Sequence, residues 1–134
     1  MRRSLPVLLV VVLLAAGCGV RTSKPYTAKG TAPCLRDKGF ASVSTSPAKI
    51  GFIASVAANG GLVATGSSGN KLTIAFTDSA DDVSDTQDSF TRFAPAGYKN
   101  HMADIMETER NAVLVWTVTP DSQELDTAKR CLQP

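Results

Sequence analysis

The stretch 111–120, NAVLVWTVTP, contains the strongest strand signal in the chain, and it decides the fold class. Residues 112–118 are almost continuously apolar, which is typical of a strand that is covered on both faces. Such a strand needs neighbouring strands and covering layers. The rest of the sequence is therefore expected to supply both.

A β-hairpin is predicted in residues 62–77. The segments 62–65 and 71–77 have the composition of strands, and the Gly- and Ser-rich sequence 66–70 provides the turn between them. Leu72, Ile74 and Phe76 alternate with less apolar residues, so one face of the second strand is expected to be buried. A short strand is also expected at 40–45.

A helix is predicted at 47–58. Ser46 is placed as its N-cap, and Pro47 falls at the first helical position, which proline favours. Ile50, Ile53 and neighbouring apolar residues recur at helical spacing. Gly51 costs such a helix about 1 kcal/mol, so a strand remains the alternative.

A second helix is predicted at 79–93. Ser79 and Asp82 have the spacing of a capping box at its start, and Pro95 ends it. Its expected inner face consists of Val83, Thr86, Phe90 and Phe93.

The C-terminal sequence predicts another helix, with Thr119 as N-cap and Pro120 at the first position. Its apolar stripe consists of Leu125, Ala128 and Leu132. A further helical turn is expected around Cys34. The segment 100–108 fits a helix and a strand equally well.

The predicted order of elements is βαββαβ, the order of a ferredoxin-like sandwich with an antiparallel sheet and two helices on one face. Extra helical pieces at both ends, carrying Cys34 and Cys131, would cover the open face of the sheet. The sequence thus predicts an α+β fold with a single domain at 33–134.

The chain begins with Arg2 and Arg3, followed by an apolar run over 5–16. A helix of this length spans about 18 Å, which is too short for a bilayer core of about 30 Å. A basic start, a short apolar run and small residues at its end are typical of a cleaved export signal. Residues 1–17 are therefore expected to be removed.

The sequence Ala15-Ala16-Gly17-Cys18 resembles the lipobox of bacterial lipoproteins. This resemblance covers residues 1–18 only, and Ala15 stands where leucine is usual. It implies that lipoprotein-processing enzymes attach a diacylglyceryl group to Cys18 and cut before it, which anchors the chain to the extracytoplasmic face of the cell membrane. An ordinary secretory signal and a twin-arginine signal are the alternatives.

The other two cysteines, Cys34 and Cys131, lie near the two ends of the predicted domain. An even number of cysteines in an exported chain favours a disulfide, because the compartment is oxidising. A reactive or metal-binding pair is the alternative. It has little support, since neither cysteine has a C-x-x-C partner.

Charge excludes one class of partner. The full chain carries 14 Lys+Arg and 12 Asp+Glu. Cleavage before Cys18 removes Arg2 and Arg3, which leaves 12 of each sign. A neutral chain without a basic cluster does not fit nucleic acid as a binding partner.

Residues 18–32 are polar and contain Gly and Pro, so a flexible tether is expected there.

Five aspartates lie at 78, 81, 82, 85 and 88. They lack the alternating spacing and central glycine of a calcium loop, and their spacing of three to four places them on one helix face. We expect these aspartates to lie on a solvated helix face. Negative charges are also favourable near a helix N-terminus, because of the helix dipole. No metal site and no cofactor are expected.

His101 is the only histidine. Asp104, Glu107 and Glu109 lie close enough in sequence to orient it in an acid–base mechanism. A surface histidine is the expected reading, and no catalytic residues are assigned. Trp116, Met102 and Met106 are expected in the core rather than in a ligand pocket.

These observations predict an extracytoplasmic lipoprotein that acts as a binding or interaction module of the cell envelope, with an envelope protein or ligand that the sequence does not identify. The alternative is a small envelope enzyme that uses His101 with a neighbouring carboxylate.

Overall fold

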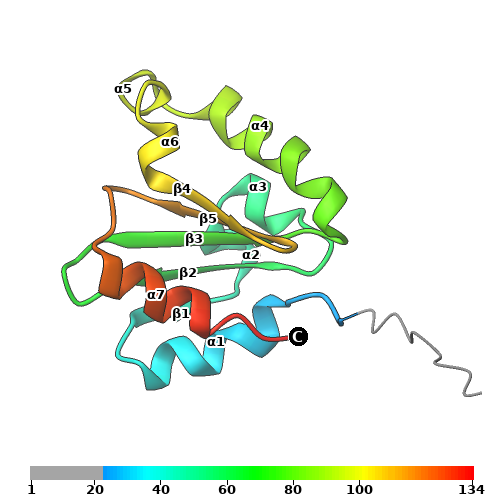
Figure 1. The fold of residues 1–134 in the computed structure, drawn as a ribbon, viewed down its shortest axis with the longest axis vertical. Coiled ribbons are helices and arrows are strands. Elements are labelled where there is room, and N and C mark those ends of the chain that lie inside the picture. The colour runs from blue at the N-terminus through cyan, green and yellow to red at the C-terminus, as the bar shows by residue number, and fades with distance from the viewer. Residues whose placement is uncertain (1–22) are drawn as a thin grey trace, which may run out of the picture.

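The computed structural model describes residues 23–134, and the expected signal segment and Cys18 lie outside the described residues. The chain forms an α+β fold around one five-stranded antiparallel sheet, in the order β1-β2-β3-β5-β4 (Figure 1). The α+β class is therefore confirmed.

The predicted hairpin and the apolar strand form the centre of the sheet. Strands β2 (Gly61–Thr65) and β3 (Lys71–Phe76) pair across the 66–70 turn, and β5 (Ala112–Trp116) pairs with the other edge of β3. Ile74 lies opposite Leu62 on one side and opposite Leu114 on the other. All three side chains are fully buried, as expected for the middle of a sheet covered on both faces.

The segment 100–108 contains both of the structures that its pattern allows. A short helix α5 (Ala96–Lys99) precedes it, then α6 (Met102–Ile105) buries Met102 and Ile105. The chain then extends directly into the edge strand β4 (Met106–Glu109), which pairs with β5. The helical spacing belongs to the first half of the segment and the alternation to the second.

The sheet order differs from that of the expected ferredoxin-like sandwich. In that fold the two strands of a βαβ unit are split by a strand from the other unit. Here β1 (Ala41–Ser44) pairs directly with β2, with Ala41 opposite Thr65. The first three strands are consecutive neighbours, and β4 adds an edge next to β5. Strands β3 and β4 run parallel with β5 between them, so the connection from β3 through α4, α5 and α6 crosses over β5 to reach the edge of the sheet.

The prediction of one continuous helix at 47–58 is wrong. Gly51 has a φ of +80°, in the left-handed region that glycine tolerates, and it divides the segment into α2 (Pro47–Ile50) and α3 (Phe52–Ser55). Pro47 is at the start of α2 as expected, but the Ser46 side chain makes no capping hydrogen bond.

The helix predicted at 79–93 is confirmed. A 3-10 turn at Ala80–Asp82 leads into α4 (Val83–Phe93), and the backbone N–H of Ser79 donates to the Asp82 carboxylate over 3.2 Å within a capping box. Val83 is buried, but Phe93 is 71% exposed, so its place on the inner face is a correction. The reason is that α3 is only one turn long and leaves the space opposite Phe93 open.

The terminal helices begin elsewhere than expected. Helix α7 (Ser122–Arg130) is capped by Asp121, which accepts from the Glu124 N–H over 2.7 Å, and not by Thr119. Helix α1 (Ala28–Asp37) starts inside the segment expected to be a tether. The folded region therefore begins before residue 33. A helical period of small residues, Ala28, Thr31 and Ala32 with Leu35, is the signal that was missed.

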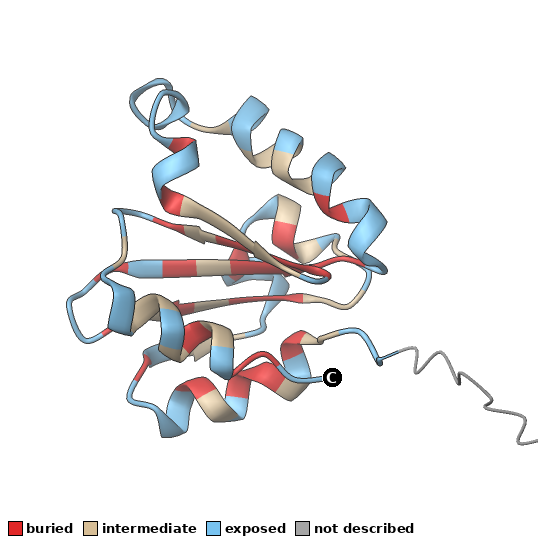
Figure 2. Ribbon diagram, in the orientation of Figure 1, coloured by how far each residue is buried: buried red, intermediate tan, exposed pale blue. Residues whose placement is uncertain are grey.

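The main core lies between one face of the sheet and the terminal helices (Figure 2). Strand side chains such as Leu72, Phe76 and Trp116 pack there with Leu35 and Ala128. The opposite face carries a much smaller cluster, in which Ile50 and Ala54 pack on Ala75. The two faces of the sheet are thus covered to very different extents.

The terminal helices are joined covalently. Cys34 in α1 and Cys131 after α7 form a disulfide with a Cα–Cα distance of 5.3 Å and a sequence separation of 97. The Thr27 N–H also donates to the Gln133 carbonyl over 2.8 Å. The predicted disulfide is therefore confirmed, and it holds the two ends of the fold together.

Removing this disulfide is expected to lower the free energy of unfolding by about 4–5 kcal/mol, because the unfolded chain loses the constraint of a very long closed loop. Urea denaturation of the Cys34→Ala/Cys131→Ala variant against the oxidised parent measures the loss. Thiol labelling of the parent should find neither cysteine free before reduction. Two labelled thiols, or an unchanged unfolding free energy, would contradict the prediction.

A buried asparagine docks the N-terminal segment onto the sheet. Asn111 is 3% exposed, and its Oδ1 accepts from the Tyr26 N–H over 2.8 Å while its Nδ2 donates to the carbonyls of Tyr26 and Thr77. The Arg110 guanidinium lies 4.2 Å from the centre of the Tyr26 ring and donates to the Lys24 carbonyl. The chain is therefore held to this end of the sheet from residue 24 onward.

The Asn111→Ala variant is expected to lose about 2–3 kcal/mol of stability, because buried backbone groups of Tyr26 and Thr77 lose their partners. The exposed Asn100 is the matched control, and its alanine variant should change stability by less than about 0.5 kcal/mol. Hydrogen exchange should show faster exchange of the Tyr26 amide in Asn111→Ala alone. Equal effects of the two variants would contradict the proposed docking.

Candidate functional site

The structure places His101 on the surface. Its side chain is 68% exposed, and Nδ1 lies 3.8 Å from Oδ2 of Asp104, whose side chain is 63% exposed. Glu109 contacts Lys129 instead, over 3.5 Å. Both members of the His101–Asp104 pair are open to water, so the surroundings do nothing to organise an acid–base site.

The five aspartates near α4 are all exposed. Asp82 is occupied in the capping box, and only Asp85 and Asp88 lie on α4 itself. Within residues 23–134, no group of three or more His, Cys, Asp or Glu side chains is placed to hold a metal ion.

Trp116 and Met102 belong to the core, with 1% and 5% exposure, and Met106 is half-buried. The Trp116 ring packs near Phe40, with 6.4 Å between ring centres. Its Nε1 has no hydrogen-bond partner within the described part of the chain.

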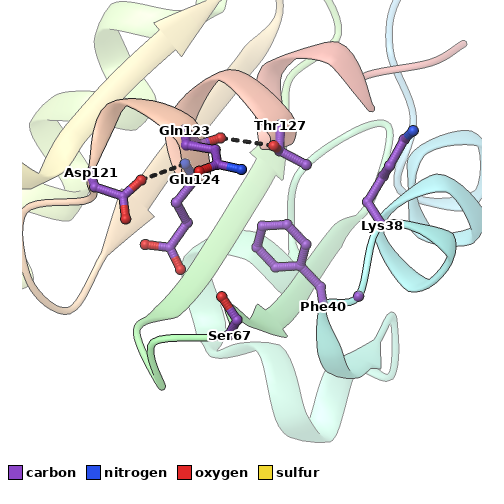
Figure 3. Close-up of a pocket in the computed structure, with 8 residues that line it drawn as sticks. Lys38, Phe40, Ser67, Asp121, Gln123, Glu124 and Thr127 are labelled. Atoms are coloured by element: carbon purple, nitrogen blue, oxygen red, sulfur yellow. Dashed lines mark hydrogen bonds between the residues drawn. The ribbon is translucent and has the colours of Figure 1, made fainter.

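A small polar hollow of about 170 Å³ lies between the end of α1, the β2–β3 turn and the start of α7 (Figure 3). Glu124 extends toward the turn, where its carboxylate accepts from Ser68 over 3.0 Å and from Asn70 over 3.5 Å. An added Cβ on Gly66 would overlap Glu124 Oε1. These contacts hold α7 against the β2–β3 turn. The polar residues around the hollow are therefore explained by packing within the fold.

The second face of the sheet carries a largely apolar groove between α3 and α4, which runs from Asp78 and Asp82 at one end to Tyr98 and Thr117 at the other. Three adjoining hollows of about 450, 510 and 230 Å³ form it, and all three share Ile53 and Phe93. Phe52 and Val56 line the α3 wall, and Phe90 lines the α4 wall. We call this the α3–α4 groove.

Large apolar side chains on the walls of this groove are exposed to solvent. Phe52 is 78% exposed, Val56 is 64% exposed and Phe93 is 71% exposed. Scattered exposed apolar residues are normal, but three large ones along one hollow are typical of an interaction surface. The charged residues that line the groove are Asp78 and Asp82, at one end.

The backbone explains why the groove stays open. Gly61 at the start of β2 has no room for a side chain, because a Cβ there would lie 2.5 Å from the Ala54 carbonyl. Helix α3 is therefore pressed onto the sheet through Ala54, which turns Phe52 and Val56 outward. The sequence pattern placed Phe93 inside the fold and did not single out Phe52. The unusual signal was Phe52 directly after the helix-breaking Gly51.

Scans of the chain against known protein families, curated proteins and solved structures found no match. Between residues 23 and 134, none of the helices combines the length and apolar character needed to cross a bilayer.

The Phe93→Ser variant is expected to lose most of its binding of an uncharged, environment-sensitive apolar dye, since it removes the exposed one of the two side chains that line all three hollows. Its unfolding free energy should change by only about 0.5 kcal/mol, because Phe93 is largely exposed. Val118 is 60% exposed outside the groove, and Val118→Ser is the matched control. Equal dye loss in both variants would show that the groove is not the preferred apolar site.

Proposed function

We propose that this chain is an exported lipoprotein that serves as a binding module of the cell envelope. A diacylglyceryl group on Cys18 holds it to the extracytoplasmic face of the membrane, and the α3–α4 groove binds an apolar or amphipathic partner. The observation that carries the binding role is the exposure of Phe52, Val56 and Phe93 along one groove.

The disulfide supports an oxidising compartment outside the cytoplasm, which agrees with the export signal expected at residues 1–17. The anchor itself rests on the lipobox resemblance. Lipoprotein-processing enzymes are the transient partners that this resemblance implies, and the lasting partner is one that presents apolar groups to the groove.

A binding role has more support than an enzyme that uses His101. A catalytic base is usually held by neighbouring groups in a site that limits water, and His101 lies on an exposed surface with an exposed carboxylate beside it. The groove contains no histidine and no cysteine. Its residues can bury apolar surface, but they offer no nucleophile with an adjacent base.

Mass spectrometry of the mature protein is expected to find Cys18 as a diacylglyceryl-modified first residue. The Cys18→Ala variant should remain uncleaved or leave the membrane fraction, because it lacks the thiol that carries the lipid and marks the cleavage site. The His101→Ala variant should keep both its processing and its dye binding. An unmodified mature chain that starts elsewhere would refute the anchor, and loss of a cellular function in His101→Ala with unchanged folding would favour the enzyme.

A further inference from the structure

The α3–α4 groove opens at the end of the sheet where the N-terminal segment is docked. Ala58, Thr77 and Asp78 line its outer hollow. The Thr77 carbonyl accepts from Asn111, and Asn111 in turn holds Tyr26. The next residue after Ala58, Asn59, accepts from the Ala28 N–H over 3.1 Å. Only one or two residues therefore separate the groove from the docked segment.

The chain available between the anchor and this docking point is short. Lys24 is already held by Arg110, so six peptide units separate it from Cys18. A fully extended chain covers at most about 3.6 Å per residue, or about 22 Å in total. A domain of about 100 residues has a radius of gyration of about 13 Å and is therefore wider than this reach. The Asn111 end of the sheet must then stay near the bilayer.

We propose that the exposed rim of the α3–α4 groove, formed by Phe52, Val56 and Phe93, inserts into the outer surface of the membrane that carries the Cys18 lipid. This inference rests on the proposed lipid anchor and names the occupant of the same groove: a zwitterionic lipid surface. The short connection keeps that surface beside the groove at a high effective concentration, so that even a weak apolar contact forms.

The charges of the groove select the type of lipid. Asp78 and Asp82 at its outer end repel an anionic headgroup and attract the ammonium group of a zwitterionic one. The apolar rim supplies the insertion, as aromatic and aliphatic side chains do at membrane interfaces. The groove therefore acts as a second attachment that orients the domain.

The helix α7 on the other face of the sheet provides an internal control. Ala128 of α7 packs in the main core, while Asp126 of the same helix is exposed to solvent. Phe52 belongs to α3, which packs on the opposite face of the sheet through Ala54 and Ala75. A membrane that contacts Phe52 from the groove side does not reach Asp126.

The test uses the lipidated mature protein in vesicles of phosphatidylcholine and phosphatidylethanolamine that carry bromine on their acyl chains. The variants are Phe52→Trp and Asp126→Trp, each at an exposed position that can hold the larger ring. The parent protein, whose single tryptophan is the buried Trp116, supplies the background. Circular dichroism confirms the fold of each variant, and a mass spectrum of the same preparation reports the lipid on Cys18.

The expected result is a blue shift and strong quenching for Phe52→Trp and neither for Asp126→Trp. Replacing part of the zwitterionic lipid with phosphatidylglycerol should weaken the quenching. Lipidated protein without quenching of Phe52→Trp overturns the inference, and so does equal quenching of the two variants. A groove that holds a protein segment instead gives no quenching in pure lipid. Absence of the lipid on Cys18 refutes the proposed anchor, whatever the fluorescence shows.

Discussion

The closure of both chain ends onto one face of the sheet is the constraint on which the rest of the structure depends. The Cys34–Cys131 disulfide and the backbone bond from Thr27 to Gln133 bring α1 and α7 together. These two helices then cover the large apolar side chains of the central strands. The other face receives the short helices α2 and α3 and the side of α4, with α5 and α6 at one end of the groove. The open groove is a direct consequence of this unequal covering.

Two buried asparagines fix the ends of the sheet. Asn70 is 4% exposed and bonds Thr117 and Val118 beside the β2–β3 turn, while Asn111 bonds the incoming N-terminal segment at the other end. Buried amides of this kind are stable only when they are hydrogen-bonded, and both have partners for oxygen and nitrogen. They therefore act as local clamps, and Asn111 also sets the point from which the preceding chain leaves the fold.

The position of that point links the fold to the proposed function. If the tether extended to residue 32, the domain could rotate freely relative to the membrane. No particular surface of the domain would then face the membrane. Because α1 starts at Ala28 and Lys24 is already held, the distance from Cys18 is less than the width of the domain. The outer hollow of the α3–α4 groove lies at this same end. The proposed anchor and the groove are therefore treated in our proposal as parts of one membrane-facing surface.

The sequence by itself determined the α+β class, the central hairpin, an apolar strand predicted at 112–118 and found at 112–116, the capped helix α4 and the cysteine pair. Each of these is encoded locally or by composition: alternation and turn residues define the hairpin, and Ser79 and Asp82 define the cap. With Cys18 assigned to the expected lipid, the two remaining cysteines allow one pairing. The groove could be predicted only in part. Its residues have the apolar character of a core, and no local pattern says whether another element covers them.

Only the tertiary structure decided the order of the strands, the early start of α1 and the exposure of Phe52 and Phe93. Strand order depends on which strand edges pair with each other. The 16 residues between β1 and β2 allow these two strands to pair as neighbours or to be separated by another strand. Phe93 is exposed because α3 ends after one turn, and α3 lies where it does because Gly61 admits Ala54 against the sheet. Such contacts join residues far apart in the chain, so helical periodicity within α4 cannot reveal them.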